Sequence, residues 1–444
     1  MAGVRLLFLL LILMADPKPT NWVAPTITAS AGQDLLIADG LVVNPRTRQI
    51  RRESLLLRGG RIVQRFDQVP TAYRGARIDA HDRYVMPGLV DMHVHAAGNR
   101  GPSGYWQSLT IEQVLRRQLY CGVVNVLDLF NDEQAIFQAR ARQRRSGAPA
   151  ARLYAAGPAL TCSGGHGTEY RVPTRVIDSP AQAERIIKAL AQRKPDVIKI
   201  VYDHYASWMP TISLATLQAA LKAASKQNVP TVVHVGTWSD VREALQGGAS
   251  AVTHVPPTAV PPDIAALFIR HKAFLIPALT VQTELAHFSE DSTLLQNPLL
   301  AAVTQQALLA DYCLKQLHAG QTKAFIQWQQ RSEPIVQANI RALSRQHVRF
   351  LVGTDSGNPG TFHGYSVHRE LQLLVKAGLS SWQALAAATT EASVLLGRPI
   401  GTEVGDSADL LVLRQSPVTD IRHTASIDFI IQQGKLVQRQ NLLQ

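Results

Sequence analysis

The sequence predicts an α/β protein in which a (β/α)8 barrel is joined to a small β-sandwich domain built from both chain ends. Short apolar, β-rich segments alternate with helix-like stretches through the middle of the chain, a pattern typical of βαβ units and a parallel sheet. Both chain ends instead carry short strands joined by Gly-containing turns. The 444 residues, 46% of them hydrophobic, are enough for one large barrel and a smaller domain.

The β-sandwich domain is expected to take residues 32–85 and 400–444. Its N-terminal part has predicted strands near residues 34–43 and 54–63, and its C-terminal part has them near residues 408–413 and 429–437. Neither end carries enough strands for an independent core. A single domain assembled from both ends is therefore the simplest arrangement.

The barrel is expected to span residues 86–399. Its eight strands are predicted within residues 85–95, 121–130, 152–161, 196–201, 230–236, 249–255, 273–279 and 348–355. A long, largely helical insertion at about residues 281–347 separates the last two of them. Insertions of this length usually shape pockets or act as lids.

Two histidines, His93 and His95, close the first predicted barrel strand. Side chains alternate along a strand with period 2, so both imidazoles project from the same face. Such a pair can present two nitrogen ligands to one metal ion. A His-x-His pair also occurs in ordinary surface strands, so the pair needs downstream partners to indicate a site.

Those partners stand at or near the carboxyl ends of later strands, where (β/α)8 barrels carry functional residues. They are Lys199, His234, His254 and Asp355. Each has a structural alternative: a hydrogen-bonded core histidine, a lysine whose ammonium reaches solvent, or an aspartate that caps a helix or turn. Chance explains any one of them, but it explains the ordered series poorly.

These residues resemble the amidohydrolase superfamily, in the branch similar to imidazolonepropionase and to the metal-dependent Xaa-Pro dipeptidases. The resemblance extends over nearly all of the chain after about residue 33 and rests on Pro87-Gly-Leu-Val-Asp-Met-His-Val-His95, Lys199, His234, His254 and Gly353-Thr-Asp355. It implies a TIM-like barrel. One departure is Val255-Pro-Pro after the sixth-strand histidine, where glycine is frequent in such proteins, and it alters the loop beside the site.

The resemblance implies two divalent metal ions, with zinc the expected metal. His93, His95 and Asp355 would bind the first ion, and His234 with His254 the second. Because an ammonium cannot ligate a cation, Lys199 would carry a carboxyl group from carbon dioxide (carboxylysine) and bridge both ions; apolar surroundings favour the neutral amine that this requires. Asp355 would take a proton from the attacking bridging hydroxide and pass it to the leaving amine.

Three more residues are candidates for contacting substrate. His166 lies in a Gly-Gly-His-Gly loop after the third strand that resembles the dipeptidase-like members. It could act in catalysis by donating a hydrogen bond to the substrate carbonyl oxygen, and its structural alternative is a loop histidine facing solvent. Tyr202 and Tyr205 follow Lys199 closely and are expected to line the pocket.

The expected function is therefore that of a binuclear metal-dependent amidohydrolase. It would cleave the amide bond of small, Xaa-Pro-like dipeptides or of N-acyl amino acids. The alternatives are a hydrolytic deaminase or a ring-opening hydrolase of a heterocycle, and a non-enzymatic relic of the fold. Lys199 disfavours the single-metal deaminase arrangement, and the intact ligand set disfavours the relic.

The charge pattern favours a small-molecule substrate. The net charge is +12, but the basic residues are dispersed and no nucleic-acid motif occurs. The basic balance is compatible with an acidic substrate. The three cysteines do not form a disulfide framework, and a homo-oligomer is compatible with the sequence.

The residue pattern at the N-terminus predicts an export signal. Arg5 precedes an apolar run over residues 6–14, which is too short for a stable membrane span and fits the h-region of a signal peptide. We expect residues 1–31 to be a signal peptide and leader, and the mature protein to be periplasmic or secreted. The alternative is a disordered N-terminal tail on a cytoplasmic protein.

Overall fold

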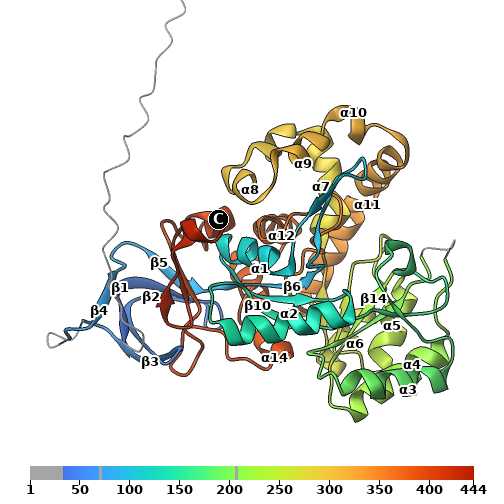
Figure 1. Cartoon of the computed structure of the whole chain (residues 1–444), viewed down its shortest axis with the longest axis horizontal. Coiled ribbons are helices and arrows are strands. Elements are labelled where there is room, and N and C mark those ends of the chain that lie inside the picture. The colour runs from blue at the N-terminus through green and yellow to red at the C-terminus, as the bar shows by residue number, and fades with distance from the viewer. Residues whose placement is uncertain (1–33, 70–72, 206–208) are drawn as a thin grey trace, which may run out of the picture.

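The computed structural model describes residues 34–69, 73–205 and 209–444, which form a mixed α/β fold (Figure 1). A largely antiparallel sheet lies at one end, and parallel strands flanked by helices form the rest. The predicted signal peptide and leader lie outside the described residues. No helix in the described ranges is both long and apolar enough to cross a membrane.

The antiparallel sheet combines the two chain ends. From the N-terminal end come β1 (Leu35–Asn44), β2 (Gln49–Arg58), β3 (Arg61–Phe66), β4 (Ala76–Asp79) and β5 (Tyr84–Pro87). From the C-terminal end come β18 (Leu410–Leu413), β19 (Ile427–Gln432) and β20 (Lys435–Leu436). The strand order is β20-β19-β18-β5-β1-β2-β3, with β4 also beside β1.

Hydrogen bonds join these strands in one continuous sheet, and its buried apolar side chains come from both chain ends. The β-sandwich expected for these two ranges stays a prediction. Strand β1 pairs with β4 through its first half and with β5 through its second, and its register with β2 shifts between Ile37 and Gly40. Such a bulge bends a sheet. The edge strand β3 then reaches the chain before β18, where Ala408 N donates to Gly60 O at 2.9 Å. Sequence alternation shows which side chains are buried, not which strands pair.

Parallel strands occur in all eight predicted segments. They are β6 (Leu89–Val94), β9 (Val123–Asp128), β10 (Arg152–Ala155), β13 (Ile198–Tyr202), β14 (Thr231–Val235), β15 (Ala251–Thr253), β16 (Phe274–Ile276) and β17 (Arg349–Phe350). They form two sheets, β10-β9-β6 and, with β11 (Leu160–Thr161) and β12 (Arg175–Val176), β12-β11-β13-β14-β15-β16-β17.

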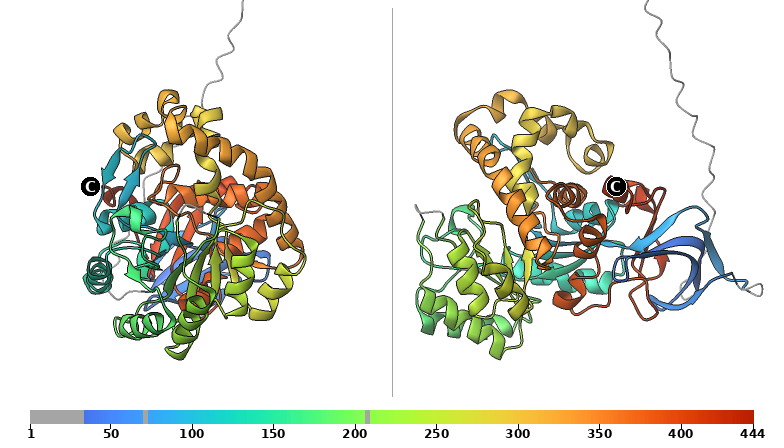
Figure 2. Two further views of the ribbon diagram at one scale, coloured as in Figure 1. Left: turned by 90° about the vertical axis from the view of Figure 1, so that its right-hand side faces the viewer. Right: turned by 180° about the vertical axis from the view of Figure 1, so that it is seen from behind.

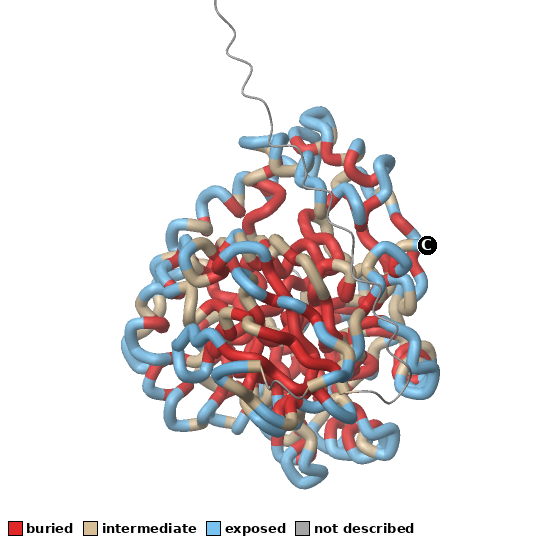
Figure 3. The backbone as a smooth tube through the Cα atoms, turned by 90° about the vertical axis from the view of Figure 1, so that its left-hand side faces the viewer, coloured by how far each residue is buried: buried red, intermediate tan, exposed pale blue. Residues whose placement is uncertain are grey.

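Backbone hydrogen bonds join the two parallel sheets at both of their junctions. Met92 N donates to Val352 O at 2.8 Å, and Asp196 N donates to Ala155 O at 2.9 Å. Side chains from both sheets also meet in one buried apolar cluster that includes Met92 and Phe274. Figure 3 shows the buried backbone gathered at the centre of the molecule.

Helices cover the outer faces of the parallel strands. They are α1 (Ile111–Tyr120), α2 (Glu133–Ser146), α3 (Pro180–Ala191), α4 (Leu214–Lys226), α5 (Trp238–Gln246), α6 (Ile264–His271), α12 (Tyr365–Lys376), α13 (Ser381–Ala387) and α14 (Ala392–Leu396). Several begin at a side-chain cap, such as Thr110 before α1 and Thr237 before α5. A short hairpin, β7 (Gly98–Arg100) with β8 (Trp106–Ser108), follows β6.

The segment between β16 and β17 is helical and forms a group on one side of the parallel strands (Figures 1 and 2). Its helices are α7 (Leu279–Glu290), α8 (Pro298–Val303), α9 (Gln306–Asp311), α10 (Leu314–Leu317) and α11 (Gly320–Arg345). Glu370 of α12 accepts from the backbone N–H groups of Leu279 and Thr280 and so fixes the start of α7. Gln329 of α11 bonds the backbone of α7 at Ala286 and Val281.

Helix α11 is also fixed to the chain that follows β15. The side-chain amide of Asn339 donates to Pro256 O at 3.1 Å and to Thr258 O at 2.8 Å, and its oxygen accepts from Val260 N. Thr258 O also accepts from Nε1 of Trp238 in α5, so this loop is bonded to both helices. Hydrogen bonds therefore fix the start of α7 and join α11 both to α7 and to the loop after β15.

Candidate metal centre

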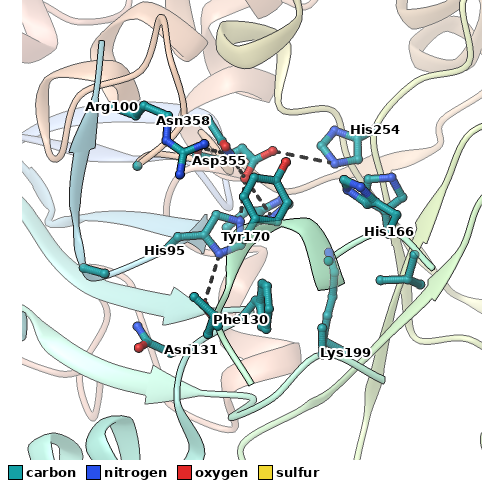
Figure 4. A pocket seen from close by; sticks show the side chains of 18 of the residues that line it. His95, Arg100, Phe130, Asn131, His166, Tyr170, Lys199, His254, Asp355 and Asn358 are labelled. Atoms are coloured by element: carbon teal, nitrogen blue, oxygen red, sulfur yellow. Dashed lines mark hydrogen bonds and ion pairs between the residues drawn. The ribbon is translucent and has the colours of Figure 1, made fainter. Parts of the chain in front are cut away.

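All six residues predicted to ligate metal meet at one cavity of about 290 Å³ (Figure 4). His93 and His95 come from the end of β6, and Asp355 follows β17, which is their neighbour across the sheet junction. Lys199 and His234 lie on β13 and β14, and His254 directly follows β15. All but Lys199 stand at or just after the carboxyl end of a strand, where barrels carry functional residues, whereas Lys199 is the second residue of β13.

The tightest group is His93, His95 and Asp355. Oδ1 of Asp355 lies 2.7 Å from Nε2 of His95 and 3.2 Å from Nε2 of His93. One ligand atom from each residue lies within 4.8 Å of the others, so the three could hold a metal ion. The other ring nitrogens have partners, because Nδ1 of His93 lies 2.9 Å from Thr253 Oγ1 and Nδ1 of His95 lies 3.3 Å from Phe130 O. Such partners orient a ligating imidazole.

The remaining three residues face the same cavity. The rings of His234 and His254 have centroids 4.5 Å apart. Nε2 of His254 lies 3.8 Å from Oδ2 of Asp355 but makes no hydrogen bond to any described residue, and neither does Nζ of Lys199. Buried polar atoms are normally paired. Two unpaired ligand-type atoms beside an imidazole–carboxylate cluster fit divalent metal ions.

Burial sets the protonation of these groups. It lowers the pKa of His93 and of His254 well below the usual 6.5, so both rings are neutral and can ligate. Burial also lowers the pKa of Lys199 to about 7, with Asp355 opposing the shift. For Asp355 burial raises the pKa, but the neighbouring imidazoles of His93 and His95, the latter through a hydrogen bond, outweigh it, and the pKa is well below the usual value.

Two of the site residues have strained backbones. His254 has φ 76° and Asp355 has φ 57°, in the left-handed region that residues other than glycine rarely adopt. Their amides are held, because His254 N donates to Ile276 O at 2.9 Å and Asp355 N to His93 O at 2.7 Å. Strain of this kind concentrates at functional sites, where the surrounding structure enforces it.

Three carboxylates that sequence reasoning missed support the ligand-type residues. Asp203 Oδ2 lies 3.4 Å from Nε2 of His234. Asp91 accepts from the hydroxyl of Thr354 at 2.6 Å and so joins β6 to the chain before Asp355. Asp128 accepts from Ala96 N at 2.7 Å. Only Asp91 carried a sequence signal, because period 2 places it on the same strand face as His93 and His95.

His166 lies where its loop was predicted to bring it. Its ring centroid is 4.8 Å from that of His234, and Nδ1 lies 2.6 Å from Glu169 Oε1. The Glu169 contact leaves Nε2 as the ring nitrogen available to a ligand. Tyr170 packs against the His166 ring, and the Arg100 guanidinium lies 5.8 Å from the centre of the Tyr170 ring. Arg100 lines the cavity, but nothing in the sequence singled it out among 45 basic residues.

Of the two tyrosines predicted to line the pocket, Tyr202 does not line this cavity. It lies three residues after Lys199, so alternation turns it to the opposite face of β13, where its buried ring packs in the core and its hydroxyl donates to Glu243. Tyr205 lines a second, outer cleft of about 1040 Å³. This cleft shares His166, Tyr170, His234, His254, Asp355 and Asn358 with the inner cavity.

Parallel strands that gather imidazoles and a carboxylate at their carboxyl ends are typical of metal-dependent hydrolases. The chain belongs to the amidohydrolase family, whose model matches residues 84–437. It is a hydrolase that acts on carbon–nitrogen bonds, from a family that generally binds divalent metals. No sequence among the curated proteins matches it.

Solved structures share the fold at low identity. A Xaa-Pro dipeptidase with bound methionine in the active site superposes with a TM-score of 0.74 and 19% identity, over 91% of this chain and 99% of that one. Molinate hydrolase gives 0.72 and 17%, over 92% and 96%. Phenylurea hydrolase B gives 0.69 and 19%, over 92% and 97%. The family and architecture expected from the sequence are thus confirmed at the level of an amidohydrolase with a mixed α/β fold.

Proposed function

We propose that this protein is a binuclear amidohydrolase that cleaves the amide bond of small, Xaa-Pro-like dipeptides or of N-acyl amino acids. One observation carries the proposal: the cluster of His93, His95 and Asp355 shares its cavity with the cation Arg100 and with Lys199, whose Nζ has no hydrogen-bond partner among the described residues. The first group supplies metal ligands, and the arginine supplies a partner for a free substrate carboxylate.

The proposal includes closure of the two parallel sheets into the predicted eight-stranded barrel. The backbone bonds at both junctions and the shared apolar cluster support it. In such a barrel the carboxyl ends of all the strands open onto one face. That geometry accounts for residues as far apart in sequence as His93 and Asp355 sharing one cavity.

We assign His93, His95 and Asp355 to one ion, His234 and His254 to a second, and a carboxylated Lys199 to both. Zinc suits this mixture of imidazole and oxygen ligands. Bound divalent ions would supply a nucleophile from water at neutral pH and polarise the amide carbonyl. The neutral amine that carboxylation needs is favoured by the burial of Lys199.

The chain's own groups then move the proton and hold the substrate. Asp355, ionised at neutral pH, accepts a proton from the attacking water and passes it to the leaving amine. His166, oriented by Glu169, faces the carbonyl oxygen of the substrate through Nε2. The scissile bond would lie between these two side chains, both of which line the inner cavity.

Metal content and substrate class test the proposal together. Protein purified without chelator is expected to hold near two equivalents of metal, and the zinc-loaded enzyme to release amino acids from dipeptides or N-acyl amino acids. A panel of heterocycles and lactones provides the comparison. Release of ammonia from a heterocycle, with no amide cleavage, would replace the proposal by the deaminase alternative. A metal content that stays at one after metal and bicarbonate are added would exclude the binuclear site.

Removing the charge of Arg100 is expected to weaken substrate binding selectively. Loss of a charge-assisted hydrogen bond costs about 1.5–3 kcal/mol, which corresponds to a rise in KM of about tenfold to a hundredfold for Arg100→Gln. Substrates whose carboxylate is replaced by a carboxamide should show little change between the two enzymes. Steady-state kinetics on both substrate types provide the measurement. The matched control is Arg145→Gln, because Arg145 is an exposed residue of α2. Equal losses on both substrate types would contradict the assignment of Arg100.

A further inference from the structure

The outer cleft is lined on two sides by aromatic side chains. Phe325 and Trp328 come from helix α11 of the insertion, and Tyr205 comes from the chain after β13. The Phe325 and Trp328 rings stack with their centroids 5.3 Å apart and their planes at 11°. Nε1 of Trp328 donates to the hydroxyl of Tyr205 at 2.7 Å, so the two sides of the cleft are tied together.

Two of these aromatic side chains are exposed although they line a concave site, and Trp328 is partly exposed. Tyr205 is 43% exposed and Phe325 is 39% exposed. Further apolar lining comes from Val255, Val281 and Leu285. Apolar side chains gathered around a cleft mark a ligand site more often than ordinary surface, because closing them off from water is favourable.

The cleft opens onto the candidate metal centre. His234, His254 and Asp355 line both the outer cleft and the inner cavity. A molecule whose amide lies among these three residues therefore extends into both spaces. The occupant of the outer cleft is thus part of the substrate and not a separate partner.

The two spaces differ in size and in chemistry. The inner cavity, of about 290 Å³, is lined by Arg100 and also by the aromatic residues Trp106 and Phe130. The outer cleft, of about 1040 Å³, has no arginine or lysine among its described lining residues, and it contains Glu169 and Asp203 beside the aromatic side chains of α11 and of the chain after β13. A substrate with a carboxylate on one side of its amide is oriented by this difference in charge and size. The amino-acid half fits the smaller space, which contains Arg100, and the acyl half fits the larger one.

We propose that the outer cleft is the subsite for the acyl half of the substrate and that it selects large apolar groups, aromatic ones above all. This inference rests on the proposed function. Stacking on Phe325 and Trp328 supplies the selectivity, because aromatic pairs bind beyond what buried area alone gives. The substrates are amino acids that carry a bulky aryl-acyl group or an aromatic N-terminal residue.

A series of acyl groups on one amino acid tests the subsite. The zinc-loaded enzyme is assayed on its N-acetyl, N-hexanoyl and N-naphthylacetyl derivatives, and kcat/KM is expected to rise at least about tenfold along the series. Trp328→Ala and Phe325→Ala should lower kcat/KM for the naphthylacetyl substrate by about tenfold to a hundredfold and leave that for the acetyl substrate within about threefold. Ile335→Ala is the matched control, because Ile335 is an exposed residue of α11 that lines neither space.

The outcomes separate this inference from the proposed function. A flat series in a wild-type enzyme that cleaves all three substrates would overturn the subsite and leave the amidohydrolase proposal standing. Equal losses on every substrate in Trp328→Ala would also overturn it, because they indicate a structural role.

If the enzyme cleaves none of the three substrates, a binding experiment still tests the subsite. Reduced-amide analogues, which cannot be hydrolysed, are titrated into metal-free protein by calorimetry. Tighter binding of the naphthylacetyl analogue that is lost in Trp328→Ala supports the subsite even where the proposed function fails. Equal binding of the acetyl and naphthylacetyl analogues would overturn it.

Discussion

Asp355→Asn is expected to lower kcat by about three to four orders of magnitude while the protein keeps part of its metal. The carboxylate of Asp355 contacts both His93 and His95, and its low pKa keeps it ionised. An amide oxygen can still ligate a metal ion, but it cannot take up and release a proton. Turnover should therefore fall much further than metal binding.

Steady-state kinetics together with elemental analysis measure both quantities on the same preparation. Asp263→Asn is a suitable control, because Asp263 forms an exposed ion pair with Arg242. A kcat within tenfold of wild type would remove Asp355 from proton transfer. Complete loss of metal would show that ligation is its main contribution.

Substitution of Lys199 is expected to abolish activity in two chemically different ways. Lys199→Ala removes the amine that carbon dioxide would modify, and Lys199→Arg keeps a charge that cannot form a carbamate. The buried Nζ makes no hydrogen bond within the described chain, so an ordinary ion-pairing role has no partner here. Metal content should fall with activity in both variants.

Chemical rescue distinguishes loss of the bridge from loss of the fold. Short-chain carboxylic acids should restore part of the activity and metal content of Lys199→Ala, but not of Lys199→Arg, where the guanidinium occupies the space. Lys226→Ala, at the exposed end of α4, is the matched control, and thermal unfolding checks that each variant is folded. Wild-type activity in either variant would return Lys199 to a structural role.

Strands occur where the sequence predicted them, and the residues predicted to ligate metal line one cavity, because both depend on local patterns. Period-2 alternation predicted one face for His93 and His95 at the end of β6, and the predicted strand segments led to Lys199, His234 and Asp355. The same rule, applied to Tyr202, would have turned it away from the site. Closeness to Lys199 in the sequence does not bring Tyr202 to the site, because an odd number of positions separates the two residues on one strand.

The features that the sequence did not predict depend on contacts between segments that lie far apart in the chain. The bend of β1 decides that the terminal strands form one sheet, and no pattern within the strands encodes which neighbour each half of β1 takes. Arg100 becomes a site residue only because a hairpin turns back over the strand ends. Trp328 meets Tyr205 across 123 positions of sequence, which no local pattern anticipates.

The attachments of the helical insertion separate the parts of this protein that can diversify from those that cannot. Glu370, Gln329 and Asn339 hold the insertion through hydrogen bonds to backbone groups and do not line the outer cleft. Residues 321, 322, 325 and 328, which line the cleft, can therefore be randomised in a library while these three residues and the histidines of the inner cavity stay constant. Variants recovered from such a library would exchange one acyl preference for another with the hydrolytic chemistry retained, a route by which descendants of one ancestral enzyme acquire new substrates.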